Sequence, residues 1–315
     1  MSWLDLHMHS EVSLDGEYSP KQLAGLCHEK GLKVAALSDH NSVRGVEEMM
    51  VSCARFGIRG IPAVELDCTF DGVDLHLLGY GIDYHDSRYA ELENRILSRK
   101  KEISFRAMKI LRDIGIIFEE EKVLALSRNG IVVGETIAEA ALADERNLNN
   151  PLLLPYRPGG ERGDNPYVNF FWDFCSQGKP AYFPADYPAF EEAQQLIEDT
   201  GGISVIAHPA NTVGKNRDRI RTMVKMGVSG LEVYSSYHTA EDVTWFHRLA
   251  EELELLETMG SDFHGKTKPS VVLGGTNARL LKTNAALGEE NGPSQEERTL
   301  ALLDYLLKIH ATFRL

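Results

Sequence analysis

The stretch KVAALSDH, residues 33–40, is a short apolar run that ends in polar and charged side chains. The same pattern recurs in four further segments, at residues 60–67, 202–209, 227–236 and 255–264. Continuous apolar runs of this length predict strands that are buried on both faces, which is typical of parallel sheets. Helix signals stand between the runs; in SPKQLAGLCHEKG, for example, Ser19 and Gln22 form a capping-box pattern and Gly31 ends the helix. The alternation predicts an α/β fold, either open or closed into a barrel.

Residues 86–180 interrupt this alternation. They contain two segments with helical periodicity, a loop rich in proline and glycine, and a further helical segment that ends at Gly178. Near the end of the chain, Ser294 and Glu297 predict the capped start of an amphipathic helix. We therefore divide the chain into a barrel over residues 1–85 and 181–283, a helical insertion that covers the barrel mouth over 86–180, and a polar loop with a C-terminal helix over 284–315.

The composition limits the kinds of function. The chain has 315 residues and a net charge of −14, which argues against a surface that binds long nucleic acid. Its four cysteines are scattered without a CxxC pair, so neither a disulfide framework nor a zinc ribbon is indicated. The first residues do not resemble a signal peptide, and no apolar run reaches membrane-spanning length. We therefore expect a cytoplasmic protein with no membrane partner.

Histidines and carboxylates gather at the ends of the predicted strands. In DLHMHS, residues 5–10, His7 and His9 would lie on one face of a strand, because side chains alternate with a period of two. The full set has nine members: His7, His9, Asp15, His40, Glu65, His76, His208, Asp262 and His264. The carboxyl ends of barrel strands meet at one mouth, where these groups would need cations in order to coexist. Imidazole and carboxylate ligands without a thiolate favour manganese, iron or zinc, and nine ligands are enough for two or three divalent ions.

Some residues in and near this set have simpler interpretations. His76, in an apolar strand, is compatible with a satisfied buried histidine, and Glu65 is compatible with a strand-end carboxylate in solvent. Asp39 is a candidate cap for the following helix, and Asp67 is expected in a loop. His238 is interpreted as a surface residue, together with the other histidines outside the set, with a position facing the mouth as the alternative because it follows a strand end. The set as a whole favours a metal site, because chance does not readily place these residue types at five separate strand ends.

The segments DLHMHS, LSDHNS, AVELD, VDLHLLGY, IAHP and GSDFHG resemble, in order and spacing, the motifs of the polymerase and histidinol phosphatase (PHP) family. The resemblance covers residues 3–85 and 181–283, and it implies a distorted seven-stranded β/α barrel with two or three metal ions at its mouth. It also implies how the ligands divide: His7, His9, Glu65 and Asp262 at the first metal, Glu65, His76 and His208 at the second, and Asp15, His40 and His264 at the third.

The insertion and the segment GSDFHGKTKP resemble the branch of metal-dependent phosphoesterases that act on small phosphate esters and nucleotides. Many members of that branch carry an Arg-x-His pattern in the insertion, where this chain has Gly134, Glu135 and Thr136. Other cations are therefore candidates for contact with the substrate phosphate. Lys179 and Arg99 stand at positions that match the branch, and Arg157 and Arg162 lie in the loop YRPGGERGDN.

The resemblance implies a hydrolase of small phosphomonoesters, either nucleotide or sugar phosphates, in which a metal-bound hydroxide attacks phosphorus. Three alternatives stay open: a cyclic phosphodiester hydrolase, an exonuclease of short oligonucleotides, and a non-catalytic accessory domain. An exonuclease would need an aromatic or basic track leading from the mouth. Phe170, Phe171 and Trp172 are candidates for it, although their helical spacing favours the core. The expected partner is a small phosphorylated metabolite or nucleotide, and neither the general acid nor the oligomeric state follows from the sequence.

Overall fold

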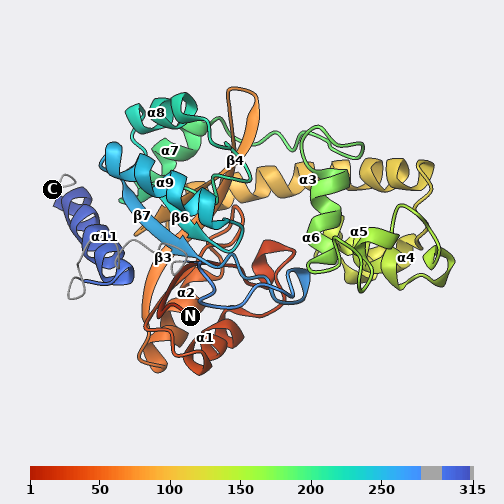
Figure 1. The fold of residues 1–315 in the computed structure, drawn as a ribbon, viewed down its shortest axis with the longest axis horizontal. Helices are drawn as coiled ribbons and strands as arrows, with labels where there is room; N and C mark the ends of the chain where they lie inside the picture. The colour runs from red at the N-terminus through yellow and green to blue at the C-terminus, as the bar shows by residue number, and fades with distance from the viewer. Residues whose placement is uncertain (278–292, 313–315) are drawn as a thin grey trace.

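The computed structural model describes residues 1–277 and 293–312, and Figure 1 shows a barrel that helix α3 (Ser87–Asp113) connects to a second lobe. The strands form one seven-stranded sheet in chain order: β1 (Leu4–Met8), β2 (Val34–Leu37), β3 (Arg59–Phe70), β4 (Val73–Tyr80), β5 (Ile203–Ile206), β6 (Gly230–Ser235) and β7 (Leu256–Gly260). The helices around the sheet are α1 (Pro20–Glu29), α2 (Val46–Arg55), α7 (Phe190–Asp199), α8 (Arg217–Lys225) and α9 (Ala240–Glu252).

The sheet curls into a nearly closed barrel, because its first and last strands meet at their carboxyl ends. There, the N–H of Asp262 donates to the carbonyl of His7 (2.8 Å), and the N–H of His9 donates to the carbonyl of Phe263 (2.9 Å). The expected seven-stranded α/β barrel is thereby confirmed. Four of the five predicted strands are shorter than predicted, since their final polar residues leave the sheet and turn into the mouth.

One part of the sheet is not parallel. Strands β3 and β4 form an antiparallel hairpin, and β4 also pairs antiparallel with β5. Asp71 (φ 49°) and Gly72 (φ 71°) occupy the two positive-φ positions of the hairpin turn, as an Asp-Gly pair commonly does. As a consequence, His76 lies within β4 opposite Asp67 of β3, and not at a carboxyl strand end. The expectation that Asp67 lies in a loop is wrong, since this residue is part of the hairpin.

The second lobe has a hydrophobic core of its own. The first half of α3 packs on the barrel through Tyr89 and Ile96, and its second half contributes Met108 and Leu111 to the core of the insertion. The other helices of this lobe are α4 (Glu120–Leu126), α5 (Gly134–Ala143) and α6 (Pro166–Phe170), which continues into a wider turn over Phe171–Cys175. The roof of the barrel is therefore stabilised by packing that does not depend on the barrel.

The C-terminal helix α11 (Gln295–Thr312) packs against the barrel. The predicted capping box is confirmed: the N–H of Ser294 donates to the Glu297 carboxylate (2.7 Å), and the N–H of Glu297 donates to the Ser294 hydroxyl (3.3 Å). Leu303 is fully buried.

The expected barrel end at 278–283 and the first part of the polar loop lie outside the described residues. None of the helices over residues 1–277 and 293–312 is both long and apolar enough to cross a membrane.

Tyr80 gives a test of how the barrel interior holds β1. Its buried hydroxyl donates to the carbonyl of Leu6 (3.0 Å), which also accepts from the Ser38 hydroxyl (3.2 Å). We expect Tyr80→Phe to lower the free energy of unfolding by about 1 kcal/mol, because one buried hydrogen bond is lost and the ring is kept. Urea denaturation measures this, with Tyr305→Phe on the surface as the control. Equal stability of the two variants would contradict the assigned role.

Candidate metal centre and active site

The mouth of the barrel brings all nine predicted ligands into one connected cluster. They come from the strands and from the loops that follow them: His7 from β1, His9 and Asp15 from the segment after it, His40 after β2, Glu65 from β3, His76 from β4, His208 after β5, and Asp262 and His264 after β7. Neighbouring imidazole nitrogens and carboxylate oxygens in this cluster lie between 2.9 and 3.5 Å apart. Residues far apart in the sequence thus share one site.

Glu65 stands at the centre of the cluster. Its Oε2 atom lies 3.3 Å from the Nε2 atoms of both His7 and His9, and these two nitrogens are 3.0 Å apart. Its Oε1 atom lies 2.9 Å from His76 Nδ1 and 3.1 Å from His208 Nε2. Since metal–nitrogen bonds are about 2.0–2.1 Å long, ligand atoms about 3 Å apart can share one ion. Glu65 is therefore placed to bridge two ions.

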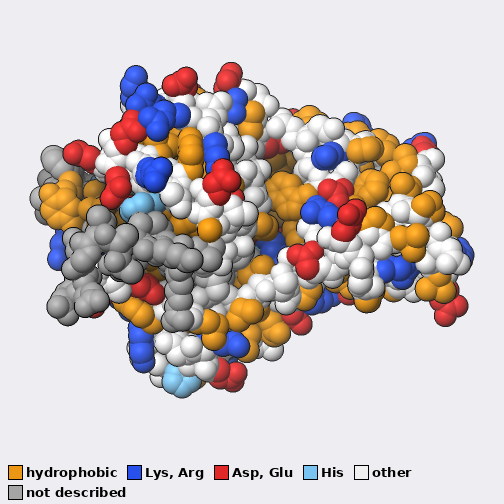
Figure 2. Space-filling view, in the orientation of Figure 1, with side chains coloured by type: hydrophobic (Ala, Val, Ile, Leu, Met, Phe, Trp, Pro, Cys, Tyr) orange, Lys and Arg blue, Asp and Glu red, His pale blue; other side chains and the backbone are white. Residues whose placement is uncertain are grey.

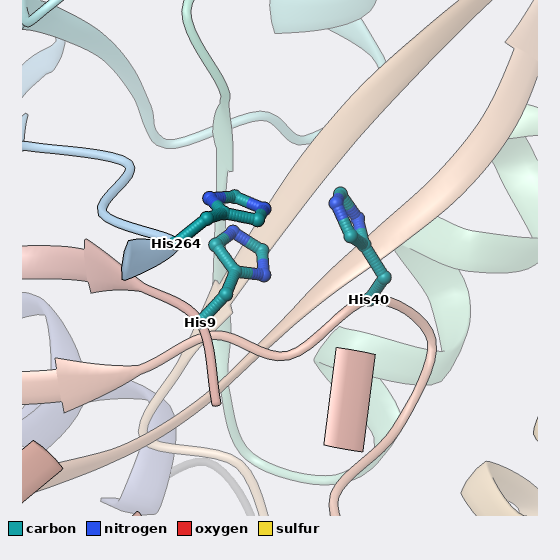
Figure 3. Close-up of side chains that lie close together, drawn as sticks. All are labelled: His9, His40 and His264. Carbon is teal, nitrogen blue, oxygen red and sulfur yellow. The ribbon is translucent and has the colours of Figure 1, made fainter. Parts of the chain in front are cut away.

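A second group of rings comprises His9, His40 and His264, which lie close together in Figure 3. The His9 ring centroid lies 4.0 Å from that of His264 and 4.4 Å from that of His40. The Nε2 atom of His264 also lies 3.3 Å from Asp15 Oδ2. Three imidazoles and a carboxylate therefore converge at the place where the third ion is expected.

The chemistry of these groups fits divalent metal ions. Several of their buried atoms have no hydrogen-bond partner: Asp15 Oδ1, His40 Nδ1, Glu65 Oε2, His208 Nδ1, Asp262 Oδ1 and His264 Nε2. Leaving a buried carboxylate oxygen or ring nitrogen unpaired is costly, whereas the same lone pairs are good metal ligands. Burial by itself would raise the pKa of the Glu65 carboxyl group. The surrounding His7, His76 and His40 outweigh this effect and hold the pKa well below its usual value.

A hydrogen-bond chain prepares His9 as a ligand. The Ser13 hydroxyl donates to Asp39 Oδ1 (2.7 Å), so it accepts from His9 Nδ1 (3.0 Å) and from the N–H of His40 (3.0 Å). This arrangement assigns the proton of His9 to Nδ1 and leaves the Nε2 lone pair facing the cluster. Burial and the neighbouring His264 and His40 lower the pKa of His9 to about 3, which keeps the ring neutral. Asp39 thus organises the ligand loop and does not cap α2, whose N-cap is Gly45.

Glu232 is a functional residue that the sequence interpretation missed. It is fully buried in β6, its Oε1 atom lies 2.9 Å from His7 Nδ1, and its Oε2 atom accepts from the backbone N–H of His208 (2.7 Å). A carboxylate on the far nitrogen orients a ligating histidine and increases its basicity. The available signal was a single glutamate inside the apolar run GVSGLEVYSS, where a charge has no reason to be buried unless it has a partner.

Asp67 and His238 also differ from their predicted roles. Asp67 Oδ1 lies 3.3 Å from His76 Nε2 and 3.5 Å from His40 Nδ1, so a tenth side chain, which is acidic, faces the ligand cluster. His238 is buried and not on the surface: Nδ1 donates to the Val233 carbonyl (2.8 Å), and Nε2 accepts from the N–H of Ala210 (3.3 Å). It ties the loop that follows His208 to β6.

A cavity of about 510 Å³ lies over the cluster, between the barrel and the insertion. This volume is within the usual range for a small-molecule site. Three lysines line the cavity: Lys100, Lys179 and Lys268. Glu135 also lines it, at the place where the Arg-x-His pattern is missing, and burial together with the charge of Asp15 raises the pKa of Glu135 to about 8. At the position of the missing Arg-x-His pattern, the roof of the cavity therefore carries a carboxyl group in place of a cation.

The other three predicted substrate cations do not line this cavity. Arg157 donates to the carbonyls of Leu142 and Asn147 inside the insertion. Arg162 pairs with Asp173 (2.9 Å), and Arg99 pairs with Glu102 and Asp186. Each guanidinium is occupied by groups of the protein, whereas Lys179 is exposed at the cavity.

The aromatic residues at the end of the insertion divide between core and cavity. Phe170 is fully buried in the core of the insertion, as its spacing predicts. Phe171 and Trp172, which were also expected in the core, line the cavity. In Figure 2, apolar side chains are visible in the hollow between the barrel lobe and the insertion lobe. The roof therefore offers flat apolar surface next to the lysines.

This barrel, with its ligand cluster under a small-molecule cavity, has the fold and site of a metal-dependent phosphoesterase. Residues 5–130 match the PHP domain. Over 264 residues the chain is 30% identical to a 5'-3' exoribonuclease from Haemophilus influenzae, which covers 82% of this chain and 89% of that relative. The chain belongs to the PHP domain family.

Other relatives carry different names. A phosphoribosyl 1,2-cyclic phosphate 1,2-diphosphodiesterase from Eggerthella lenta is 26% identical, covering 83% of this chain and 94% of its own length. A 3',5'-nucleoside bisphosphate phosphatase from Chromobacterium violaceum is also 26% identical, over 84% of this chain and 88% of the relative. A solved structure from Bifidobacterium adolescentis, provisionally named a metal-dependent phosphoesterase, superposes with a TM-score of 0.65 at 25% identity, over 87% and 91% of the two chains.

Gly260 tests how tightly the ligands are positioned. A Cβ atom there would lie 2.1 Å from His7 Cβ and 2.4 Å from Glu232 Oε1, so Gly260→Ala must displace one of them. We expect metal affinity to fall about 10- to 100-fold, as when an orienting partner is lost. Elemental analysis of the folded protein measures this. Gly25→Ala, where the nearest atom lies 4.0 Å away, is the control and should keep the wild-type content. Full metal content in Gly260→Ala would refute the tight fit.

Proposed function

We propose that this protein hydrolyses small phosphomonoesters, such as nucleotide or sugar phosphates, with two or three divalent ions of manganese, iron or zinc. The observation that carries the proposal is the cluster of buried, unpaired ligand atoms directly beneath a cavity of about 510 Å³. The proposed ligands are the nine predicted side chains, in the three groups given above. Four triads of ligand atoms that lie close enough to hold an ion support a metal centre at this cluster, although they do not follow the three groups and one of them includes Asp67: His7, His9 and Asp262; His7, Glu65 and His208; His9, His40 and His264; and His40, Asp67 and His76.

When bound, the ions supply a water of lowered pKa as the nucleophile and neutralise charge on the phosphate oxygens. The protein positions the ligands before the ions arrive: Ser13 and Asp39 orient His9, and Glu232 orients His7. The insertion covers the mouth and limits the access of bulk water, which strengthens electrostatic interactions inside. Among the predicted cations, the position of Lys179 at the cavity supports a role in binding substrate phosphate.

The size and charge of the site favour a small substrate. The insertion is fastened to the barrel rim at several points, for example by Arg128 and Glu11 (3.0 Å) and by the Ser270 hydroxyl and Asn165 (2.9 Å). The net charge of −14 disfavours a long polyanion. The name of the Chromobacterium relative supports a nucleotide phosphate as substrate. The sulfhydryl groups of all four cysteines are free, which is compatible with the reducing cytoplasm that we propose as the location.

Two other activities within the same chemistry have support of their own. The name of the Haemophilus relative, together with Phe171 and Trp172 at the cavity wall, favours an exonuclease of short oligonucleotides as the second candidate. The name of the Eggerthella relative favours a cyclic phosphodiester as the third. The cavity fits one or two nucleotide units better than a long strand, and for this reason we place the monoester first.

Metal dependence is the first test of the proposal. Protein purified without chelator should contain more than one equivalent of divalent metal, because the cluster offers more ligands than one ion can use. Removing the metal should abolish phosphate release, and manganese should restore it. Elemental analysis and a phosphate-release assay on the same samples measure both. Full activity after exhaustive chelation would refute metal-dependent hydrolysis.

Substrate size is the second test. The panel comprises AMP, a nucleoside 3',5'-bisphosphate, a ribose cyclic phosphate, a dinucleotide and a long single strand, compared by kcat/KM per reactive end. We expect the mononucleotides to be the best substrates, because the roof leaves room for one or two units. The highest value for the long strand would establish the exonuclease instead, and the highest value for the cyclic phosphate would establish the diesterase. No turnover of any member by metal-loaded protein would indicate an accessory domain.

A further inference from the structure

Lys268 is a charged side chain buried at the edge of the ligand cluster. It lies in the loop after β7, just past the 3-10 turn Gly265–Thr267, and six residues beyond Asp262. Only 6% of its side chain is exposed, although lysine is among the residues least often buried. It also lines the cavity above the cluster. A buried ammonium that opens only into a substrate-sized cavity calls for a functional explanation.

The carboxylate of Asp262 divides its two oxygens between the ligand cluster and this lysine. Asp262 Oδ1 lies 3.1 Å from His9 Nε2 and 3.5 Å from His7 Nε2. Asp262 Oδ2 lies 2.6 Å from Lys268 Nζ. The Lys268 ammonium and the Asp262 carboxylate thus form a buried ion pair at the edge of the ligand cluster.

The neighbours of the ammonium leave one side of it open. Of its three N–H donors, one faces Asp262 Oδ2, and the ring of Tyr237 stands on another side, with its centroid 5.1 Å from Nζ. The Tyr237 side chain is also hydrogen-bonded to Lys268, which leaves one of the three N–H donors without a partner in the part of the chain that the structure describes. This third donor is available to a ligand in the cavity that Lys268 lines, and Asp262 alone separates the ammonium from His7 and His9.

We propose that Lys268 donates a charge-assisted hydrogen bond to a non-bridging oxygen of the substrate phosphate, next to the metal ions. This inference rests on the proposed phosphoesterase function and names a residue that binds its substrate. Lys100, which pairs with Asp67 at 3.3 Å, and Lys179, which is exposed, lie at the same cavity but are less buried. Of these three lysines, Lys268 is the one that pairs with one of the nine predicted ligands, Asp262.

Removing the charge of Lys268 is expected to affect metal binding and phosphate binding differently. Removing a positive charge beside the site should leave divalent ions bound equally well or more tightly, since the repulsion between like charges is lost. The same change should weaken the binding of inorganic phosphate to the metal-loaded protein about 10- to 100-fold, because one charge-assisted hydrogen bond disappears. Lys268→Met makes this change with little alteration in length. Isothermal titration calorimetry measures phosphate binding, and elemental analysis measures metal content.

Lys266→Met is the matched control. Lys266 lies two residues earlier, its side chain is half exposed, and it pairs with Glu139 on the surface of the insertion (2.7 Å). Its loss should change neither phosphate binding nor metal content, because exposed pairs contribute little. Lys268→Arg keeps the charge and should retain more of the phosphate affinity than Lys268→Met. This variant also reports on the position if Lys268→Met proves too unstable to measure.

Two results would overturn the inference. If Lys268→Met loses metal and phosphate together, the lysine serves only to hold Asp262 in place. If phosphate binding is unchanged in Lys268→Met at full metal content, the ammonium does not contact the anion. Failure of the proposed function is distinguishable from both, because phosphate binding is measured without turnover. Wild-type protein that binds phosphate through Lys268 but hydrolyses no phosphomonoester would refute the function and support the binding role.

Discussion

The mutual crowding of buried metal ligands is the constraint on which the rest of this structure depends. Around Glu65, the ring nitrogens of His7, His9, His76 and His208 all lie within 3.3 Å of one of the two carboxylate oxygens. Buried groups at such distances need either shared protons or cations between them. The barrel must hold these atoms in place before any ion binds, because a buried ligand that moves away finds neither water nor another partner.

A second layer of carboxylates supplies that rigidity from deeper in the barrel. Asp5 accepts backbone N–H groups of Ser261 (2.9 Å) and Gly274 (2.8 Å), so β1 is tied to the segment that carries two further ligands. In the same way, Asp39 accepts from the N–H and the hydroxyl of Ser10, and Glu232 accepts from the N–H of His208. Each of these side chains is fully or almost fully buried and connects its own strand or strand end to another segment of the chain. Ligand geometry is thus a property of the closed barrel and not of any single loop.

The roof over the mouth has a different physical basis. The insertion packs around its own hydrophobic core, which is separate from the core of the barrel. Its cavity face combines Lys100 and Lys179 with the apolar rings of Phe171 and Trp172, and with the carboxyl group of Glu135. The ligand cluster and most of the cavity wall above it therefore belong to two separately stabilised parts of the same chain.

The sequence by itself predicted an α/β fold and nine candidate ligands, because apolar runs and the polar residues near their ends are local patterns that parallel strands bring to one edge, and the resemblance to the PHP motifs added the closed barrel. Only the tertiary structure decided which cations face the cavity: Lys268 points into it, whereas Arg157 and Arg162 bind groups inside the insertion. The same holds for Glu232 and Asp67, two strand residues whose partners come from other strands. The physical reason is that the environment of a charged side chain depends on contacts between distant segments, which no local pattern contains.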